Sequence, residues 1–274
     1  FCGWDLAGRF RHDVIDDFGA GYQAGRARNP CMRGNGRVEF AALLERALEL
    51  GFDAVCTGHC AILRDGERGL ELHRSSEEAK DQSYVLGVLT AEQLAHTYFP
   101  LGETPSKSLV RAEAEARGLA VASKPDSYDI CFIPDGDTRG WLADRVGAAP
   151  GEILDRPGEV VGSHDGAHAC TVGQRKGLRL GVPAPDGKPR FVLEVRPVTN
   201  TVVVGPREAL AVGELAGSRY TWAGAAPDDA REAFACDVQV RAHADPVPAT
   251  AVVRDGELSV VPDEPLHGVA PGQT

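Results

Sequence analysis

The sequence predicts an α/β region followed by two smaller β regions. From residue 1 to about residue 143, helical apolar spacing alternates with short apolar runs of strand length. From about residue 144 the texture changes, because glycine and proline punctuate short runs rich in β-branched residues. A second such series begins near residue 209. We therefore expect domains at residues 1–143, 144–208 and 209–274.

The elements of the first region follow from spacing and from start and stop residues. The apolar residues Phe10, Val14, Ile15, Phe18 and Tyr22 recur at spacings of three and four, which predicts a helix over residues 10–22, and Gly25 opens a loop. Further along, the sequence predicts a helix over 38–50, a buried strand over 54–57, a hairpin around 65–66, a helix over 91–96 capped by Thr90, and a helix over 106–117 ended by Gly118.

The later regions read as strands separated by turns. The expected strands cover residues 151–154, 160–162, 169–172, 190–195 and 201–205, and then 236–241, 249–253 and 258–261. The second series is expected to form a sheet or barrel whose last strand is missing. The chain lacks an initiator methionine, so we expect it to be cut at both ends.

Composition excludes several classes of protein. Hydrophobic residues make up 43% and charged residues 25%, values typical of globular proteins, and no apolar run is long enough to span a bilayer. Seven cysteines without regular spacing favour reduced thiols in a cytoplasmic protein over a disulfide framework. The net charge of −11 argues against general attraction to nucleic acid but leaves room for a local basic patch.

The stretch from Lys124 to Ile133 contains the main candidate nucleophile. Cys131 follows a Lys-Pro-Asp-Ser segment and lies in a short apolar run, so we expect its thiol at the end of a strand that faces a site. The alternative is a buried cysteine that acts as a small hydrophobe.

Four other segments carry candidate polar groups, each with a purely structural alternative. Residues 26–35 combine three arginines with Asn29, Pro30 and Cys31, and form either an anion-facing loop or a solvated one. Gly58 and His59 end a predicted strand, where ligands bind in α/β folds, or else His59 is a polar residue with its hydrogen bonds satisfied and no ligand. The segment Lys80-Asp81-Gln82 suits phosphate and base edges, or else starts a helix capped by Asp81. The turn Gln174-Arg175-Lys176 is the local basic patch, or an ordinary exposed turn.

Six short motifs in order resemble the bacterial tRNA-specific 2-thiouridylases, which are tRNA-uridine 2-sulfurtransferases. The motifs are Asn-Pro-Cys-x-x-Gly-Asn, Thr-Gly-His, Lys-Asp-Gln-Ser-Tyr, Asp-x-x-x-Ile-Cys-Phe-Ile, Gly-Gln-Arg-Lys-Gly-Leu and Pro-Gly-Gln. The resemblance runs from about residue 5 to residue 274. It implies a truncated Rossmann-like ATP-pyrophosphatase domain, similar to the adenine nucleotide alpha hydrolases, then a small β domain and a β-barrel.

The resemblance also implies a reaction. In this family ATP activates O2 of the wobble uridine, at position 34 of the tRNA, and a cysteine persulfide replaces that oxygen with sulfur. Cys131 matches the cysteine that carries the persulfide. The family's second catalytic cysteine corresponds to Gly34, which has no side chain, and Cys31 is the possible substitute. We therefore expect this chain to be inactive.

The remaining expectations concern ligands. Gly58 matches an ATP-binding position, and Asn29, Pro30 and Cys31 match the segment around the target base. The positions that match tRNA contacts are His59, Lys80, Asp81, Gln82, Arg241 and Gln273, with Gln174, Arg175 and Lys176 as further candidates. No Ser-Gly-Gly-x-Asp-Ser pyrophosphate loop occurs in the sequence.

The expected cofactor is ATP with Mg, and neither an iron–sulfur cluster nor another metal site is expected. The expected partners are tRNA and a sulfur-donor protein, the chain is expected to be a monomer, and no membrane is involved. Two alternatives stay open: a non-catalytic tRNA-binding remnant, and a sequence error that produced Gly34 and the missing ends.

Overall fold

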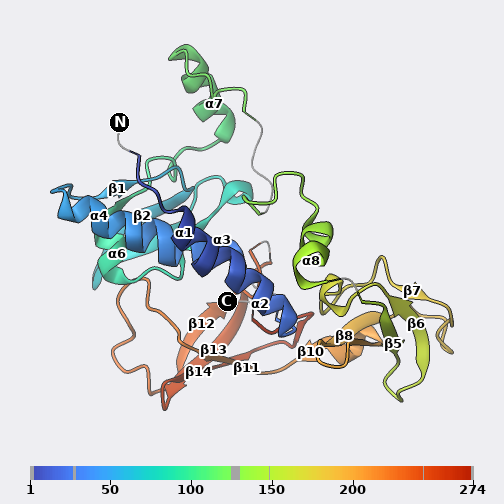
Figure 1. The fold of residues 1–274 in the computed structure, drawn as a ribbon. Coiled ribbons are helices and arrows are strands. Elements are labelled where there is room, and N and C mark those ends of the chain that lie inside the picture. The colour runs from blue at the N-terminus through green and yellow to red at the C-terminus, as the bar shows by residue number, and fades with distance from the viewer. Residues whose placement is uncertain (1–2, 27–28, 125–129, 148, 243, 273–274) are drawn as a thin grey trace.

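The computed structural model confirms the predicted order, with an α/β region followed by two β regions (Figure 1). It describes residues 3–26, 29–124, 130–147, 149–242 and 244–272. Among these residues, no helix is both long and apolar enough to cross a membrane.

Two long helical stretches begin the chain, each a run of α- and π-helical turns. The first comprises α1 (Ala7–Phe10), η1 (Arg11–Asp16) and α2 (Asp17–Gln23). The second comprises α3 (Pro30–Arg33), η2 (Gly34–Leu43) and α4 (Leu44–Glu49). The predicted first helix is confirmed. The second begins at Pro30, eight residues before the predicted start, because Asn29 and Pro30 form a strong N-terminal cap.

The rest of the α/β region holds short elements. They are β1 (Val55–Cys56), β2 (Ala61–Gly66), β3 (Gly69–Arg74), η3 (Glu78–Lys80), α5 (Ser83–Leu86), α6 (Ala91–Ala95), β4 (Thr97–Tyr98), α7 (Lys107–Ala116) and α8 (Thr138–Val146). β1 and β4 pair in parallel, and β2 and β3 form the predicted hairpin. The prediction of a buried strand at β1 is wrong, because Cys56 is exposed.

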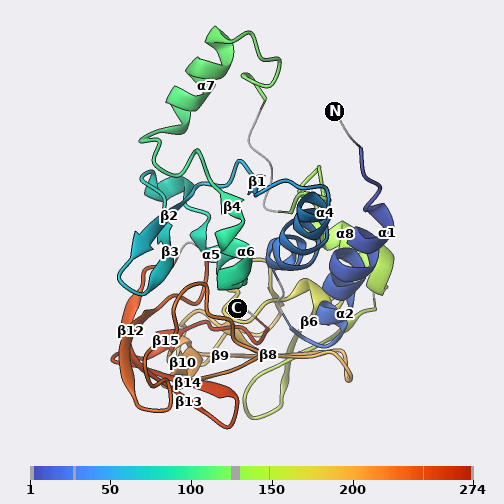
Figure 2. The ribbon, with the colours of Figure 1, turned by 90° about the vertical axis from the view of Figure 1, so that its left-hand side faces the viewer.

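Caps explain the boundaries of two of these helices. At α6 the Thr90 side chain accepts a hydrogen bond from Gln93 N, and the Gln93 side chain accepts one from Thr90 N, as the predicted cap requires. At α7 the N-cap is Ser106, and Gly118 follows the helix with a positive φ of 67°. In both views α7 projects away from the rest of the molecule (Figures 1 and 2).

The central region is a five-stranded sheet with the order β7-β6-β5-β9-β8. Its strands are β5 (Gly151–Leu154), β6 (Val160–His164), β7 (Arg179–Leu180), β8 (Phe191–Arg196) and β9 (Thr201–Gly205). The strand predicted over residues 169–172 is absent, because the 3-10 turn η4 (Ala167–Ala169) precedes an irregular segment there. Cys170 of that segment packs into the core of the sheet.

The C-terminal region contains a four-stranded antiparallel sheet with the order β11-β14-β13-β12. Its strands are β11 (Leu215–Ser218), β12 (Phe234–Val238), β13 (Val247–Arg254) and β14 (Glu257–Pro262). The 3-10 turn η5 (Arg207–Leu210) precedes it, and β10 (Ala211–Val212) pairs with β15 (Leu266–His267).

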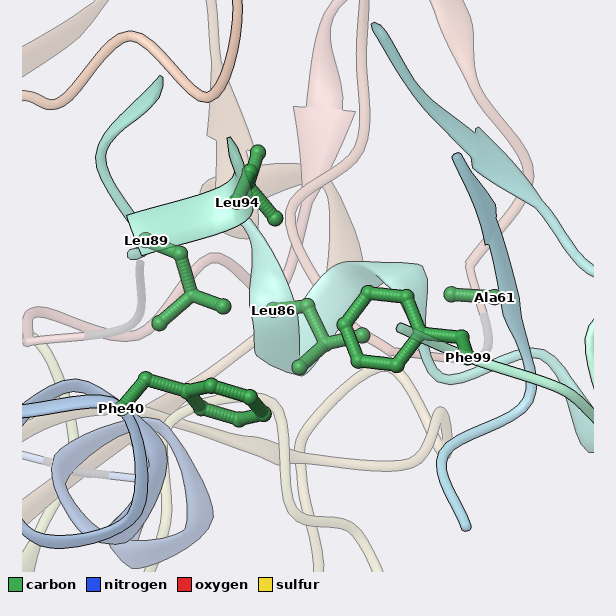
Figure 3. Close-up of a cluster of buried hydrophobic side chains, with 6 residues drawn as sticks. All are labelled: Phe40, Ala61, Leu86, Leu89, Leu94 and Phe99. Carbon is green, nitrogen blue, oxygen red and sulfur yellow. The ribbon is translucent and has the colours of Figure 1, made fainter. Parts of the chain in front are cut away.

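A buried apolar cluster joins the second long helix to the elements that follow it. Figure 3 shows Phe40 facing side chains from α5, α6 and the strands beside them. The members of this cluster are Phe40, Ala61, Leu86, Leu89, Leu94 and Phe99. Its role is to fix the β1–β4 pair and the segment after α5 relative to the helix.

The β2–β3 hairpin attaches the α/β region to the C-terminal strands. Arg74 Nη2 donates to Gln239 Oε1 at 2.6 Å, and Arg68 Nη1 lies 3.2 Å from Asp228 Oδ1. Ala223 also packs against the apolar cluster of the α/β region. Figure 2 shows the hairpin next to β12, so the two regions share a contact surface.

Candidate functional site

Asn29, Pro30 and Cys31 form the first turn of a helix. The Asn29 side-chain oxygen accepts a hydrogen bond from Cys31 N at 3.0 Å, and Pro30 occupies the first helical position, where no backbone N–H is required. This corrects the expectation of a loop at these residues. Cys31 is half-buried within a fixed helical turn, so a substitution for a thiol at position 34 cannot depend on a mobile loop.

Gly34 lies one helical turn after Cys31. Its φ and ψ are −56° and −50°, ordinary right-handed helical values that any residue adopts. A Cβ atom added to Gly34 would have no heavy atom within 4 Å. Positions 31 and 34 share one face of the helix, because residues three apart are neighbours on a helix surface. The backbone therefore accommodates a cysteine at position 34.

Arg33 ties this helical turn to the first helix. Its Nε and Nη2 atoms donate to Asp17 Oδ2 and Oδ1, both at 3.2 Å, so the pair is bidentate. Both side chains are largely buried, with 29% and 26% exposed. Arg33 is one of the three arginines predicted to face an anion or solvent, but its pairing with Asp17 was not predicted, because an Arg and an Asp sixteen positions apart carry no signal.

Cys131 lies in a turn and is exposed, so the expected strand is wrong. The two residues after it anchor the turn. Ile133 is 1% exposed in a cluster with Phe18 and Leu142, and the Phe132 ring stacks edge-on against Phe18 at 5.7 Å. The thiol therefore faces solvent while its neighbours fix its backbone. Residues 125–129, which precede it in the motif, lie outside the described residues.

Gly58 and His59 follow β1 at the carboxyl end of the β1–β4 pair. Gly58 is exposed, and a Cβ added to it would meet only Leu101, at 3.9 Å. His59 Nδ1 lies 2.9 Å from Thr57 Oγ1, and its ring packs between Phe40 and Phe99. Burial lowers the pKa of His59, which keeps the ring neutral near pH 7.

Asp81 and Gln82 hold their own segment in place. Asp81 accepts hydrogen bonds from Ser75 N at 2.8 Å and from Ser83 Oγ at 2.7 Å. Gln82 N donates to Cys60 O at 2.8 Å, and Cys60 N donates to Gln82 Oε1 at 2.9 Å. The two motifs that contain His59 and Gln82 thus form one unit, with the half-buried Lys80 at its edge.

Arg241 connects three segments that are distant in sequence. Its guanidinium donates to the carbonyl oxygens of Gly268 and Val172. Its charge also acts to lower the pKa of Tyr84, although burial is the larger effect and raises that pKa. Gln273, the other predicted contact in this region, lies outside the described residues.

The turn over residues 174–176 uses its amide internally. Gln174 Oε1 accepts from Thr171 N, and Gln174 Nε2 donates to Lys176 O, both at 3.0 Å. Arg175 and Lys176 are exposed, and neither has an ion-pair partner within the part of the chain that the structure describes. The cations of this turn are therefore available to an anionic partner.

Within residues 3–26, 29–124, 130–147, 149–242 and 244–272, no group of three or more His, Cys, Asp or Glu side chains is placed to hold a metal ion.

Comparison with known proteins gives consistent matches along the chain. Residues 1–135 match the family described as the tRNA methyl transferase HUP domain, and residues 139–206 match the tRNA methyl transferase PRC-barrel domain. Residues 212–274 match the aminomethyltransferase beta-barrel domain.

Curated relatives match over nearly the whole chain. A protein of Leifsonia xyli subsp. xyli named tRNA-specific 2-thiouridylase MnmA is 70% identical over 272 residues, which are 99% of this chain and 74% of that protein. Proteins of the same name from Clavibacter michiganensis subsp. michiganensis and Micrococcus luteus are 69% and 63% identical. These matches cover 99% and 100% of this chain, and 71% and 75% of the relatives.

Proposed function

The chain belongs to the family of tRNA-specific 2-thiouridylases, and from this premise we propose that it binds tRNA and carries sulfur on Cys131 for 2-thiolation of the wobble uridine. Membership of this family implies ATP use and a tRNA substrate. The observation that supports Cys131 as the carrier is its exposure in a turn that Phe132 and Ile133 anchor. A sulfur-donor protein needs such access to load a persulfide.

The proposed reaction has three balanced steps. Uridine O2 attacks the α-phosphate of ATP, and pyrophosphate leaves. The terminal sulfur of the Cys131 persulfide bonds to uridine C2, and the C2–O2 bond breaks as AMP departs. A second thiolate then attacks the Cys131 sulfur, which forms a disulfide, breaks the persulfide S–S bond and leaves sulfur on C2. An external reductant regenerates both thiols.

Gly58 is the proposed contact to ATP, and Mg is the proposed counterion of the ATP. It is exposed at the carboxyl end of parallel strands, where α/β folds bind nucleotides, and its lack of a side chain leaves the backbone open. We propose no iron–sulfur cluster, because residues 29–35 contain a single cysteine.

The tRNA contacts are proposed along one connected set of segments. His59 and the Lys80–Gln82 segment form a single hydrogen-bonded unit, and Arg241 joins the neighbourhood of Tyr84 to Val172 next to the Gln174–Lys176 turn. We propose that this unit, this turn, Arg241 and Gln273 bind tRNA as parts of a monomer.

Gly34 limits the last step of the proposed reaction. Without a second thiol in the protein, the S–S bond of the Cys131 persulfide breaks only when an external thiol attacks it. Cys31 shares the helix face of position 34 but lies one turn away, and displacement of about 1 Å already lowers catalytic rates severely. We therefore propose that this chain forms the persulfide and releases sulfur slowly.

The test uses the persulfide-loaded protein and does not need ATP. In the Gly34→Cys variant, the new thiolate attacks the Cys131 sulfur, a disulfide forms and hydrosulfide leaves. Hydrosulfide measured with a fluorescent probe should appear at least about 100-fold faster than from the unmodified chain, because an oriented intramolecular thiol gains a large effective concentration. Mass spectrometry should show the disulfide.

The control places a thiol on a different helix face. Gly36→Cys is two residues further along, and residues two apart do not share a face, so it should release hydrosulfide no faster than the unmodified chain. Equal rates for the two variants contradict the role of position 34, and loading that persists in Cys131→Ser contradicts the role of Cys131.

A second candidate function is tRNA binding without catalysis, which Gly34 itself favours. Salt-dependent tRNA binding by the unmodified chain, together with no hydrosulfide release from Gly34→Cys, supports this alternative. Filter binding at two salt concentrations measures the first property.

A further inference from the structure

A pocket lies between helix α8 and the central sheet. Its volume is about 410 Å³, within the range typical of sites for small organic ligands. One wall is α8, through Arg139 and Ala143, and the opposite wall includes His164, Gln174 and Leu178. None of these residues except Gln174 was a candidate from the sequence.

His164 forms a buried part of the wall of this pocket. The residue is 6% exposed, and its Nε2 atom has no hydrogen-bond partner among the described residues. Its Nδ1 atom accepts a hydrogen bond from Gly166 N at 3.0 Å, so the neutral ring carries its proton on Nε2. The Asn200 carbonyl raises the pKa of the ring, but burial is the larger effect and lowers it. The Nε2 atom is itself shielded from solvent, so His164 shapes the wall of the pocket and the polar contacts to a ligand come from other side chains.

The charge around the pocket favours an anion. Arg139 is exposed on α8 and has no ion-pair partner in the described part of the chain, whereas Arg179 pairs with Asp165. The Arg139 charge lies close enough to Cys170 to act against the burial that raises the pKa of that thiol. Arg175 and Lys176 follow Gln174 directly and are exposed. The lining therefore supplies a guanidinium, with further cations nearby.

The pocket is too large for phosphate alone, and part of its wall is apolar. Leu178, Ala143 and Ala169 are partly exposed and provide carbon surface next to the polar groups. We infer that this pocket binds a nucleoside monophosphate unit, with the phosphate at Arg139 and the base against the apolar wall. If the unit is a nucleotide of bound tRNA, the inference rests on the proposed function. Binding of a free mononucleotide does not depend on that function.

Helix α8 links this pocket to the Cys131 turn. Leu142 packs with Ile133, and the Trp141 ring lies 5.4 Å from the Phe132 ring. Arg139 and Ala143 of the same helix line the pocket. A bound nucleotide would thus contact the helix that supports the sulfur-carrying turn.

Calorimetric titration with uridine 5′-monophosphate tests the site on the intact chain. We expect binding of this nucleotide and at least about tenfold weaker binding of uridine, because a charge-assisted contact to phosphate is lost. Arg139→Ala should weaken binding of the nucleotide about tenfold for the same reason, and Ala143→Leu should abolish it by filling the pocket. Arg254→Ala, which removes an exposed arginine of the C-terminal sheet, is the matched control and should change nothing.

Three outcomes overturn the inference: no binding of the nucleotide, equal binding of uridine, or equal effects of Arg139→Ala and Arg254→Ala. If tRNA and uridine 5′-monophosphate compete, the natural occupant of the pocket is a nucleotide of tRNA. If both bind at the same time, the natural occupant is a free mononucleotide. The titrations measure nucleotide binding whether or not the chain releases hydrosulfide. Failure of the proposed function is therefore distinguishable from failure of this site.

Discussion

Cys131 and Gly34 are both supported by the first long helix, but different interactions fix them. The Cys131 turn is held by apolar packing, since Phe132 and Ile133 contact Phe18. The turn at Gly34 is held by a helix cap and by the Arg33–Asp17 pair. One half of the proposed site thus depends on a core, and the other half on hydrogen bonds at a helix start.

The proposed site is complete at Cys131 and lacks a side chain at position 34. The exposed thiol and its buried anchors are both present at Cys131. At position 34 the helical backbone, its cap and the open space for a side chain are present, and only the side chain is absent. The single substitution Gly34→Cys therefore tests the second half. Variants that remove the supporting interactions of each half show how much each interaction contributes to stability.

The largest effect is expected at the core under Cys131. Ile133→Ala should reduce the free energy of unfolding by about 2–5 kcal/mol, because it removes a fully buried side chain and leaves a cavity. Urea unfolding measures this loss. Val198→Ala is the control, since Val198 is fully exposed and its truncation should change stability by less than about 0.5 kcal/mol. A similar small loss for Ile133→Ala would show that packing does not fix the Cys131 turn.

A smaller loss is expected from the ion pair at the other half. Arg33→Ala should cost about 1–2 kcal/mol, because it leaves the largely buried Asp17 without its bidentate partner. Arg46→Ala breaks an exposed pair with Glu49 and should cost less than about 0.5 kcal/mol. Equal losses in thermal unfolding would place the Arg33–Asp17 pair among ordinary surface pairs.

The helix cap should contribute about as much or slightly less. Asn29→Ala should cost about 1 kcal/mol, because the side-chain oxygen that accepts from Cys31 N is lost. Asn29→Asp keeps that acceptor and should retain most of the stability. If Asn29→Asp is as unstable as Asn29→Ala, a role other than capping explains the asparagine.

The smallest effect has the opposite sign. Gly34→Ala should raise the free energy of unfolding by about 0.5–1 kcal/mol, because the position is helical and open and glycine is a poor helix former. Gly118→Ala should instead lower it, since Gly118 has a φ of 67°. Destabilisation by Gly34→Ala would show that position 34 lacks room for any side chain.

Much of the fold could be predicted from local pattern. The helix over residues 10–22, the cap at Thr90, the helix over residues 106–117, the hairpin near Gly66 and most strands after residue 150 follow from spacing and turn residues. The errors have physical causes. The cap at Asn29 and Pro30 extends the second helix backwards through a segment rich in loop-forming residues, and the apolar residues around Cys131 serve as anchors in a turn instead of a strand.

The candidate residues could be found from motif and chemistry, but their neighbours could not. The reciprocal hydrogen bonds between Gln82 and Cys60 span twenty-two positions, and the bond from Arg241 to Val172 spans sixty-nine. The pocket between α8 and the central sheet combines residues of α8 with residues of β5, β6 and the 174–179 segment. No local spacing reports such contacts.

The sequence by itself determined the order of an α/β region and two β regions, the family and the absence of a thiol at position 34, because composition, periodicity and short motifs are local properties. The tertiary structure decided that Cys131 is exposed on a buried anchor and that position 34 is helical with room for a side chain. It also decided that His164 is buried beside a pocket. These properties depend on which distant side chains remove water from a residue, and only the packed chain specifies that.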